Sequence, residues 1–166
     1  MIKKKICMLG SFAVGKTSLV RQYVDSIFSE KYHTSIGVKI DKKVVTVEGK
    51  AVNLILWDIH GEDEFQKIQA SHLIGTSGYF LVIDGTRSNT VAVVKELNQF
   101  TIKHIGAVPF MVLINKADLL DDWEIIEEEM ELLKEKGWEI VKTSAKTGEG
   151  VEEAFKRLAV KILEYK

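Results

Sequence analysis

The segment that most constrains this chain runs from Gly10 to Thr17 and reads Gly-Ser-Phe-Ala-Val-Gly-Lys-Thr. It follows a short apolar run, residues 6–9, that is typical of a buried strand, and it leads into an apolar stretch that predicts a helix. A strand, a Gly-x4-Gly-Lys-Thr turn and a helix in this order are the context that a phosphate-binding loop requires. We therefore predict that backbone N–H groups of the turn and of the helix N-terminus converge on an anion.

Two side chains at the end of this run are suited to a nucleoside phosphate. The ammonium group of Lys16 would reach the terminal phosphates, and the hydroxyl of Thr17 would help to hold a Mg²⁺ ion that keeps most of its waters. A chance turn ahead of a helix is the alternative, and the strand and helix around the run count against it. The other candidate nucleotide-binding residues of this region are Gly10, Phe12, Ala13, Val14, Gly15 and Ser18.

Composition narrows the class of protein. With 166 residues, of which 46 % are hydrophobic and 28 % charged, the chain is expected to form one soluble globular domain over residues 1–166. A net charge of −1 argues against a nucleic-acid-binding protein, which usually carries a basic excess. The single cysteine, Cys7, lies inside the first apolar run and is expected to be a buried hydrophobe, so no disulfide framework exists and a reducing, cytoplasmic location is favoured.

Neither end of the sequence predicts a membrane anchor. The apolar run after the basic start is too short for an export segment, and no apolar run approaches the roughly 18 residues of a membrane span. Ile2 is incompatible with N-myristoylation, and the last four residues contain no cysteine for prenylation. We expect any membrane association to depend on a partner protein, unless a C-terminal tail is missing.

Apolar runs and amphipathic stretches alternate along the chain. Strands are expected over residues 4–9, 38–47, 51–58, 79–84, 110–114 and 139–143, with a tight turn at 48–50 that predicts an antiparallel hairpin. Helices are expected over residues 16–24, from about 62–65 to 74, over 90–103, after a cap at Asp121 or Asp122, and over 151–164. This order predicts an α/β fold with a six-stranded, mostly parallel sheet, one antiparallel hairpin strand and helices on both faces.

Ligands of such sheets bind beyond the carboxyl ends of the strands, where the remaining motifs lie. Asp58 ends the third strand, where a carboxylate can hold Mg²⁺ through water, and the N–H of Gly61 could approach a third phosphate. Asn115, Lys116 and Asp118 follow the fifth strand. An aspartate there can accept two hydrogen bonds from guanine that adenine cannot supply, although this short motif alone is equally compatible with a solvated turn.

A third motif, Ser144-Ala145-Lys146, follows the last strand, where an amide N–H would meet the guanine oxygen and the lysine stem would cover the ring. Together the motifs resemble the Ras superfamily of small GTPases, most closely its Rab branch, over essentially the whole chain. The resemblance is carried by Gly10 to Thr17, Ser35-Ile36-Gly37, Trp57-Asp58 with Gly61, Asn115-Lys116 with Asp118, and Ser144-Ala145-Lys146. It implies a P-loop NTPase G domain that is monomeric. The missing lipidation cysteine favours a bacterial or soluble member.

The resemblance also implies a switch that binds GTP and GDP with Mg²⁺ and slowly hydrolyses GTP. Catalytic roles would fall to Glu62, Lys16 and Gly61, and Mg²⁺ would be held by Thr17, Ser35 and Asp58. Phe28 matches the aromatic residue that packs beside the guanine in this family. Effectors, exchange factors and activating proteins would contact the segments from Tyr32 to Val38 and from Gly61 to Ile74.

Three residues depart from the family pattern. Ser35 replaces a threonine, Glu62 replaces the glutamine that orients the attacking water, and Phe12 replaces a small or polar residue where an arginine finger would enter. An ionised glutamate only accepts hydrogen bonds, whereas glutamine also donates. A hydrolysis-deficient scaffold that holds GTP or GDP is therefore the main alternative. An ATP-using P-loop kinase is a more distant one, because the sequence offers no arginine-bearing lid.

Overall fold

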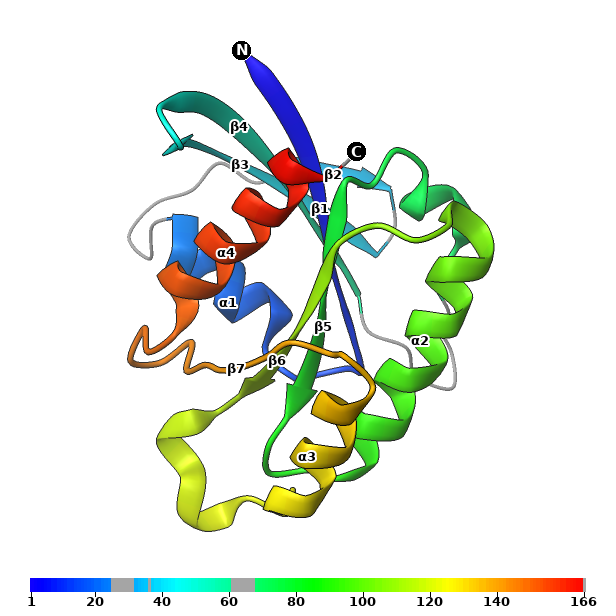
Figure 1. Cartoon of the computed structure of the whole chain (residues 1–166), viewed down its shortest axis with the longest axis vertical. Coiled ribbons are helices and arrows are strands. Elements are labelled where there is room, and N and C mark those ends of the chain that lie inside the picture. The colour runs from blue at the N-terminus through cyan, green and yellow to red at the C-terminus, as the bar shows by residue number, and fades with distance from the viewer. Residues whose placement is uncertain (25–31, 36, 61–67, 166) are drawn as a thin grey trace.

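The computed structural model describes residues 1–24, 32–35, 37–60 and 68–165 (Figure 1). Its strands are β1 (Ile2–Gly10), β2 (Tyr32–Ser35), β3 (Val38–Val47), β4 (Lys50–Ile59), β5 (Gly78–Asp84), β6 (Phe110–Asn115) and β7 (Ile140–Lys142). Its helices are α1 (Lys16–Val24), α2 (Asn89–Ile105), α3 (Glu127–Glu135) and α4 (Val151–Glu164), with 3₁₀ helices η1 (Ala70–Leu73) and η2 (Ala117–Asp122). No helix in these described ranges is long and apolar enough to cross a membrane.

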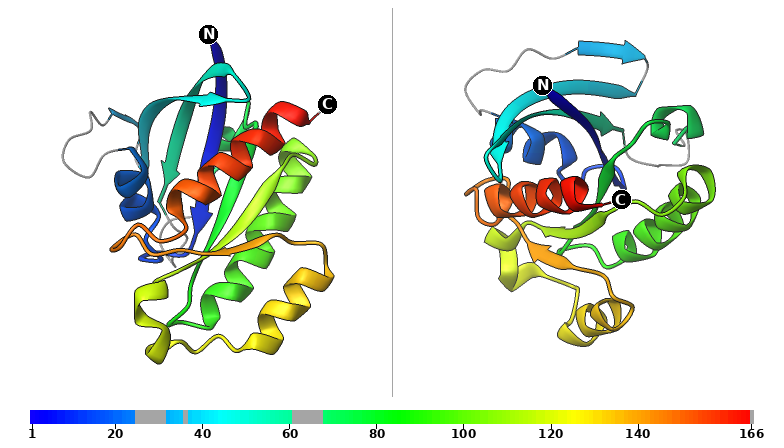
Figure 2. Two further views of the ribbon diagram at one scale, coloured as in Figure 1. Left: turned by 60° about the vertical axis from the view of Figure 1, so that its left-hand side comes forward. Right: turned by 45° about the horizontal axis from the view of Figure 1, so that its top comes forward.

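One sheet organises the molecule, with the strand order β2-β3-β4-β1-β5-β6-β7. Helices α1 and α4 cover one face, and α2 and α3 lie on the other (Figure 2). Alternate residues of β1 separate accordingly, because successive strand side chains point to opposite faces. Ile6 and Met8 join the core under α1 and α4, whereas Cys7 and Leu9 join the core under α2. The expected α/β fold and the burial of Cys7 are both confirmed.

The sheet is parallel except around β3, which pairs antiparallel with both β2 and β4. The turn between β3 and β4 has positive φ at Glu48 (+50°) and Gly49 (+79°), which suits a two-residue hairpin. The expected hairpin is therefore confirmed. The sheet has one more strand than the six expected, because four residues of the polar segment before Gly37 add to its edge as β2.

Two expected helices differ from the structure. The sequence predicts a cap at Asp121 or Asp122 for the helix after β6, but α3 begins at Glu127, because residues 117–122 form η2 and Trp123 is extended. The indole N–H of Trp123 donates to the carbonyl oxygen of Lys116 at 2.8 Å, and this bond joins the residue after η2 to the residue before it. Of the helix expected to reach Ile74, residues 61–67 lie outside the described chain, and the rest contributes only the short η1.

Candidate functional site

The loop between β1 and α1 is the first part of the candidate site. Its backbone is left-handed at two residues, with φ of +63° at Ala13 and +104° at Gly15. Gly15 has no room for a side chain, because a Cβ atom there would lie 2.2 Å from Nδ2 of Asn115. The loop runs directly into α1, whose first N–H groups have no acceptor within the helix. The backbone geometry is therefore typical of an anion-binding loop.

Lys16 lies beneath this loop and is 5 % exposed. Its Nζ donates to the carbonyl oxygens of Gly10 at 3.0 Å and Ser11 at 3.1 Å. Burial lowers the pKa of Lys16 to about 8, with Asp58 opposing this shift and Arg87 adding to it. A phosphate beside Nζ would favour the charged form, so anion binding and protonation of Lys16 would reinforce each other.

Thr17 and Asp58 offer oxygen ligands next to Lys16. The Thr17 hydroxyl donates directly to Oδ2 of Asp58, a residue near the end of β4 that is only 2 % exposed. A hydroxyl and a carboxylate are the hard oxygen donors that Mg²⁺ prefers, so this donor set fits the ion implied by the sequence. For Ser35, the third expected ligand, the structure describes only the backbone in β2.

Two cavities meet at this edge of the sheet. The first encloses about 420 Å³ and is lined by Phe12, Ala13, Gly15, Lys16, Thr17, Ser18, Lys39, Asp58, His60 and Lys116. The second encloses about 350 Å³ and is lined by Gly15, Ser18, Asn115, Lys116, Asp118, Leu119, Ala145 and Lys146. Gly15, Ser18 and Lys116 line both cavities, so the two adjoin. Three lysines and one carboxylate are among the residues that line the first cavity, which suits a polyphosphate.

Asn115 joins three segments around these cavities and is 2 % exposed. Its Nδ2 donates to the carbonyl oxygen of Val14 at 3.0 Å, and its Oδ1 accepts from the Thr143 hydroxyl at 3.2 Å and the Ala145 N–H at 3.3 Å. The Ala145 N–H, which was expected to meet a guanine oxygen, therefore already has a long bond that a ligand would share or replace.

Asp118 is exposed along the second cavity. The hydroxyl of Ser144 donates to its Oδ1 at 2.7 Å, and Ser144 in turn accepts from the N–H of Thr147 at 3.1 Å. A carboxylate has about four lone-pair sites, so the bond from Ser144 orients Asp118 and leaves capacity to accept from a ligand. Lys146 lines the same cavity.

Comparison with known proteins agrees with this geometry. The model of the Ras family matches residues 5–164. The chain belongs to the Ras family. It is similar to the GTP-binding protein Rheb homolog of Dictyostelium discoideum, with 33 % identity over 158 residues, which cover 93 % of this chain and 85 % of that protein. These matches identify a small GTPase of the Ras superfamily, and the Rab branch is a finer assignment than they make.

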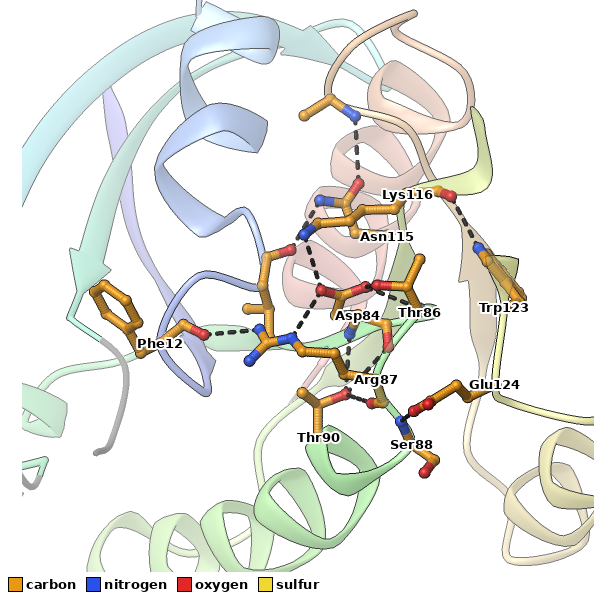
Figure 3. A network of polar contacts seen from close by, with 12 residues as sticks. Phe12, Asp84, Thr86, Arg87, Ser88, Thr90, Asn115, Lys116, Trp123 and Glu124 are labelled. Atoms are coloured by element: carbon orange, nitrogen blue, oxygen red, sulfur yellow. Dashed lines mark hydrogen bonds and ion pairs between the residues drawn. The ribbon is translucent and has the colours of Figure 1, made fainter. Parts of the chain in front are cut away.

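A buried carboxylate that the sequence analysis did not single out, Asp84, connects the two halves of this Ras-family site (Figure 3). Its side chain is fully buried, and Oδ2 lies 2.8 Å from Nζ of Lys116 and 3.0 Å from Nε of Arg87. Its Oδ1 accepts from the N–H of Thr86 at 2.8 Å and from the Thr86 hydroxyl at 2.7 Å. The available signal was its position, because Asp84 ends a wholly buried strand at the same edge as Asp58.

These contacts determine the charge of Asp84. Burial by itself would raise the pKa of Asp84, but the hydrogen bonds from Lys116, Thr86 and Arg87 outweigh burial and place the pKa below its ordinary value. The carboxylate is therefore ionised at neutral pH and faces two cations. Lys116 belongs to the motif expected to bind the nucleotide base. Its ion pair with Asp84 also anchors it to β5, the strand that lies between β1 and β6.

The remaining expected residues divide into two groups. Phe28, Gly61 and Glu62 lie outside the described residues. Phe12 is described, lines the phosphate-loop cavity and is 65 % exposed. His60 lines the same cavity, and so does Lys39, which was not expected from the sequence.

Proposed function

We propose that this Ras-family protein is a guanine-nucleotide switch that binds GTP and GDP with Mg²⁺ and slowly hydrolyses GTP. The observation that carries the proposal is the pair of adjoining cavities. One is lined by the phosphate loop and lysines, and the other by the Asp118 segment, with Gly15, Ser18 and Lys116 common to both. Phosphates in the first cavity and a base in the second correspond to the two ends of one nucleotide.

Guanine is the base that the second cavity favours. Asp118 would accept hydrogen bonds from the ring N1–H and the exocyclic amine of guanine, and Ser144 holds the carboxylate at 2.7 Å. Adenine presents an unprotonated N1 at the corresponding position, so it would leave the carboxylate without one of its two donors. A site built on such bonds discriminates strongly against the base that lacks them.

The phosphate end would depend on three described residues. Lys16 would give up its two backbone acceptors and place its charge on the terminal phosphates. Thr17 and Asp58, together with Ser35, would hold Mg²⁺, which when bound neutralises phosphate charge and orients the oxygens. Gly61 and Glu62 would act on the third phosphate and on the attacking water, as the family resemblance implies.

A hydrolysis-deficient nucleotide-binding scaffold is the second candidate. The exposed ring of Phe12 lines the phosphate cavity, where an arginine supplied by an activating protein would have to enter. Glu62 adds a group that accepts but does not donate when ionised. Both features favour a protein that acts by holding a nucleotide and not by hydrolysing GTP.

Signalling would follow from the third phosphate of GTP, with Mg²⁺, ordering the segments from Tyr32 to Val38 and from Gly61 to Ile74. We propose that effectors, exchange factors and activating proteins contact these segments of a cytoplasmic monomer. The Ser35-Ile36-Gly37 and Trp57-Asp58 patterns support a Rab-like member of the superfamily. The energy available to the switch is the difference in contacts that GTP and GDP make.

The first experiment identifies the nucleotide in the purified protein and compares GDP with ADP in competition for a fluorescent GDP. Bound guanine nucleotide and a preference for GDP are expected, and a preference for ADP would overturn the proposal.

Single-turnover phosphate release from GTP-loaded protein then separates the switch from the hydrolysis-deficient scaffold. Slow but measurable release supports the switch. No release over many hours, with fast release in Glu62→Gln, supports the scaffold.

A further inference from the structure

The peptide group between Phe12 and Ala13 lies where the phosphate loop meets Arg87 (Figure 3). The carbonyl oxygen of Phe12 accepts a hydrogen bond from Nη2 of Arg87 at 2.8 Å. A trans peptide directs its C=O and N–H groups to opposite sides, so the N–H of Ala13 points away from Arg87. Because Phe12 and Ala13 both line the phosphate-loop cavity, the orientation of this peptide decides what the loop presents to an anion.

The backbone conformation of Ala13 in this loop is energetically unfavourable. Ala13 has φ of +63°, a left-handed conformation that is unfavourable for a residue with a Cβ atom. The loop sequence supplies alanine at this position instead of glycine, so contacts from outside the loop must help to hold the conformation. The bond from Arg87 to the preceding carbonyl is such a contact, and it comes from a residue 75 positions later in the sequence.

Arg87 is itself held in place by the carboxylate of Asp84. Its Nε donates to Oδ2 of the fully buried Asp84 at 3.0 Å, while Nη2 reaches Phe12. Asp84 is held in turn by Thr86 and by Lys116. A planar guanidinium can bridge two acceptors in fixed directions, and a lysine ammonium at the end of a flexible stem cannot do so equally well.

We propose that Arg87 is a positioning residue for phosphate binding, which holds the Phe12–Ala13 peptide so that the Ala13 N–H faces the phosphates. Arg87 does not contact the nucleotide in this role; it acts through the loop backbone. Through Asp84 it also ties the phosphate loop to Lys116, so the phosphate and base sides are set in place together before the ligand arrives. The inference rests on the proposed binding of guanine nucleotides.

The test compares Arg87→Met with Arg157→Met. The two arginine side chains are equally exposed, at 38 %, and both form ion pairs. Arg157, however, lies on α4 and pairs with Glu139, just before β7, and with Glu153 of the same helix. Affinity for GDP is measured by competition with a fluorescent GDP. We expect Arg87→Met to weaken GDP binding about tenfold and Arg157→Met to leave it unchanged, because the lost bond is charge-assisted.

Thermal unfolding with and without GDP distinguishes positioning from a merely structural role. A structural role would lower the midpoint equally in both conditions, whereas positioning reduces the increase that GDP produces. Arg87→Lys keeps the positive charge but cannot bridge Asp84 and the Phe12 carbonyl oxygen in the same way, so we expect its GDP binding to be weakened as well. If Arg87→Met does not fold, the GDP affinity of Arg87→Lys tests the inference by itself.

Two results would overturn the inference. One is wild-type GDP affinity in Arg87→Met, and the other is full recovery in Arg87→Lys, which would show that only the charge matters. In both cases the wild-type protein still binds GDP, so the proposed function stands. If the wild-type protein itself fails to bind GDP, the proposed function is overturned, and this inference with it.

Discussion

The Nδ2 atom of Asn115 lies 3.0 Å from the carbonyl oxygen of Val14, and this bond joins the end of β6 to the phosphate loop across 101 residues of sequence. The same amide accepts hydrogen bonds from Thr143 and Ala145 at the far side of the base cavity. A single buried side chain thus fixes the distance between the segments expected to hold the phosphates and the base.

Asn115→Ala should therefore impair nucleotide binding. Removing the amide leaves its partners in the loops unpaired, and each such loss is worth about 1–3 kcal/mol. GDP affinity should fall by roughly tenfold to a hundredfold, as measured by competition binding. Asn98→Ala is the matched control, because Asn98 is also buried and accepts from Tyr79 at 2.6 Å, but it lies on α2. It should reduce stability only; an equal loss of GDP affinity in both variants would contradict the prediction.

Nucleotide binding should take up a proton above pH 8. The pKa of Lys16 is lowered to about 8 in the free protein by burial, and a bound phosphate would raise it. Between these two pKa values the free form binds fewer protons than the complex, so GDP affinity falls as pH rises, by up to about tenfold per unit. Calorimetry at pH 8.5 in two buffers of different ionisation enthalpy measures the uptake. Binding without proton uptake at that pH would disprove the prediction.

Asp118→Asn should change base preference. The new side chain donates from its NH₂ group and keeps one carbonyl acceptor, so it no longer matches the two donors of guanine. It matches xanthine, which offers one donor and one carbonyl oxygen. We expect GDP affinity to fall by on the order of a hundredfold and xanthosine diphosphate to become the better ligand. Asp121→Asn, at an exposed position nearby, should bind GDP like the wild type.

Asp84→Asn should destabilise the fold in a pH-dependent way. Removing the charge of Asp84 costs about 1–3 kcal/mol, because Arg87 and Lys116 lose their counter-charge but are themselves about a third exposed to water. The pKa of Asp84 is lowered in the folded protein, so its contribution is complete above the unfolded pKa of about 4 and is lost as pH falls through the folded value. Urea unfolding should show a constant difference from pH 7 to pH 5 that narrows below about pH 4. A difference independent of pH would argue that the charge of Asp84 is unimportant.

Several features of the site were predictable because each is encoded in a short stretch. The Gly10 to Thr17 loop needs only a strand, its glycines and a helix start, and all three lie within about twenty residues. Asp58 and Asn115 lie at the ends of β4 and β6, Ser144 comes soon after β7, and the carboxyl ends of parallel strands share one edge of the sheet. The structure brings all of these residues to that edge.

Other features were not predictable from local pattern. Strand β2 forms from a polar stretch without the alternation typical of a strand, because it needs only the free edge of β3. The helix expected after Asp121 or Asp122 begins only at Glu127, because residues 117–122 fold as η2 and Trp123 turns back to Lys116. Trp123 also packs against Gly85, where a Cβ atom would lie 2.2 Å from its ring, and this contact determines both positions.

The sequence by itself determined the order of strands and helices apart from β2, together with the phosphate loop and the family, because periodicity and short motifs depend on neighbouring residues. Only the tertiary structure decided which charges meet. Strand β5 lies between β1 and β6 in the sheet, so the loop after it must lie between the phosphate loop and the Asn115 segment. That placement, and no local pattern, brings Asp84 and Arg87 against Phe12 and Lys116, where a buried carboxylate requires cations around it.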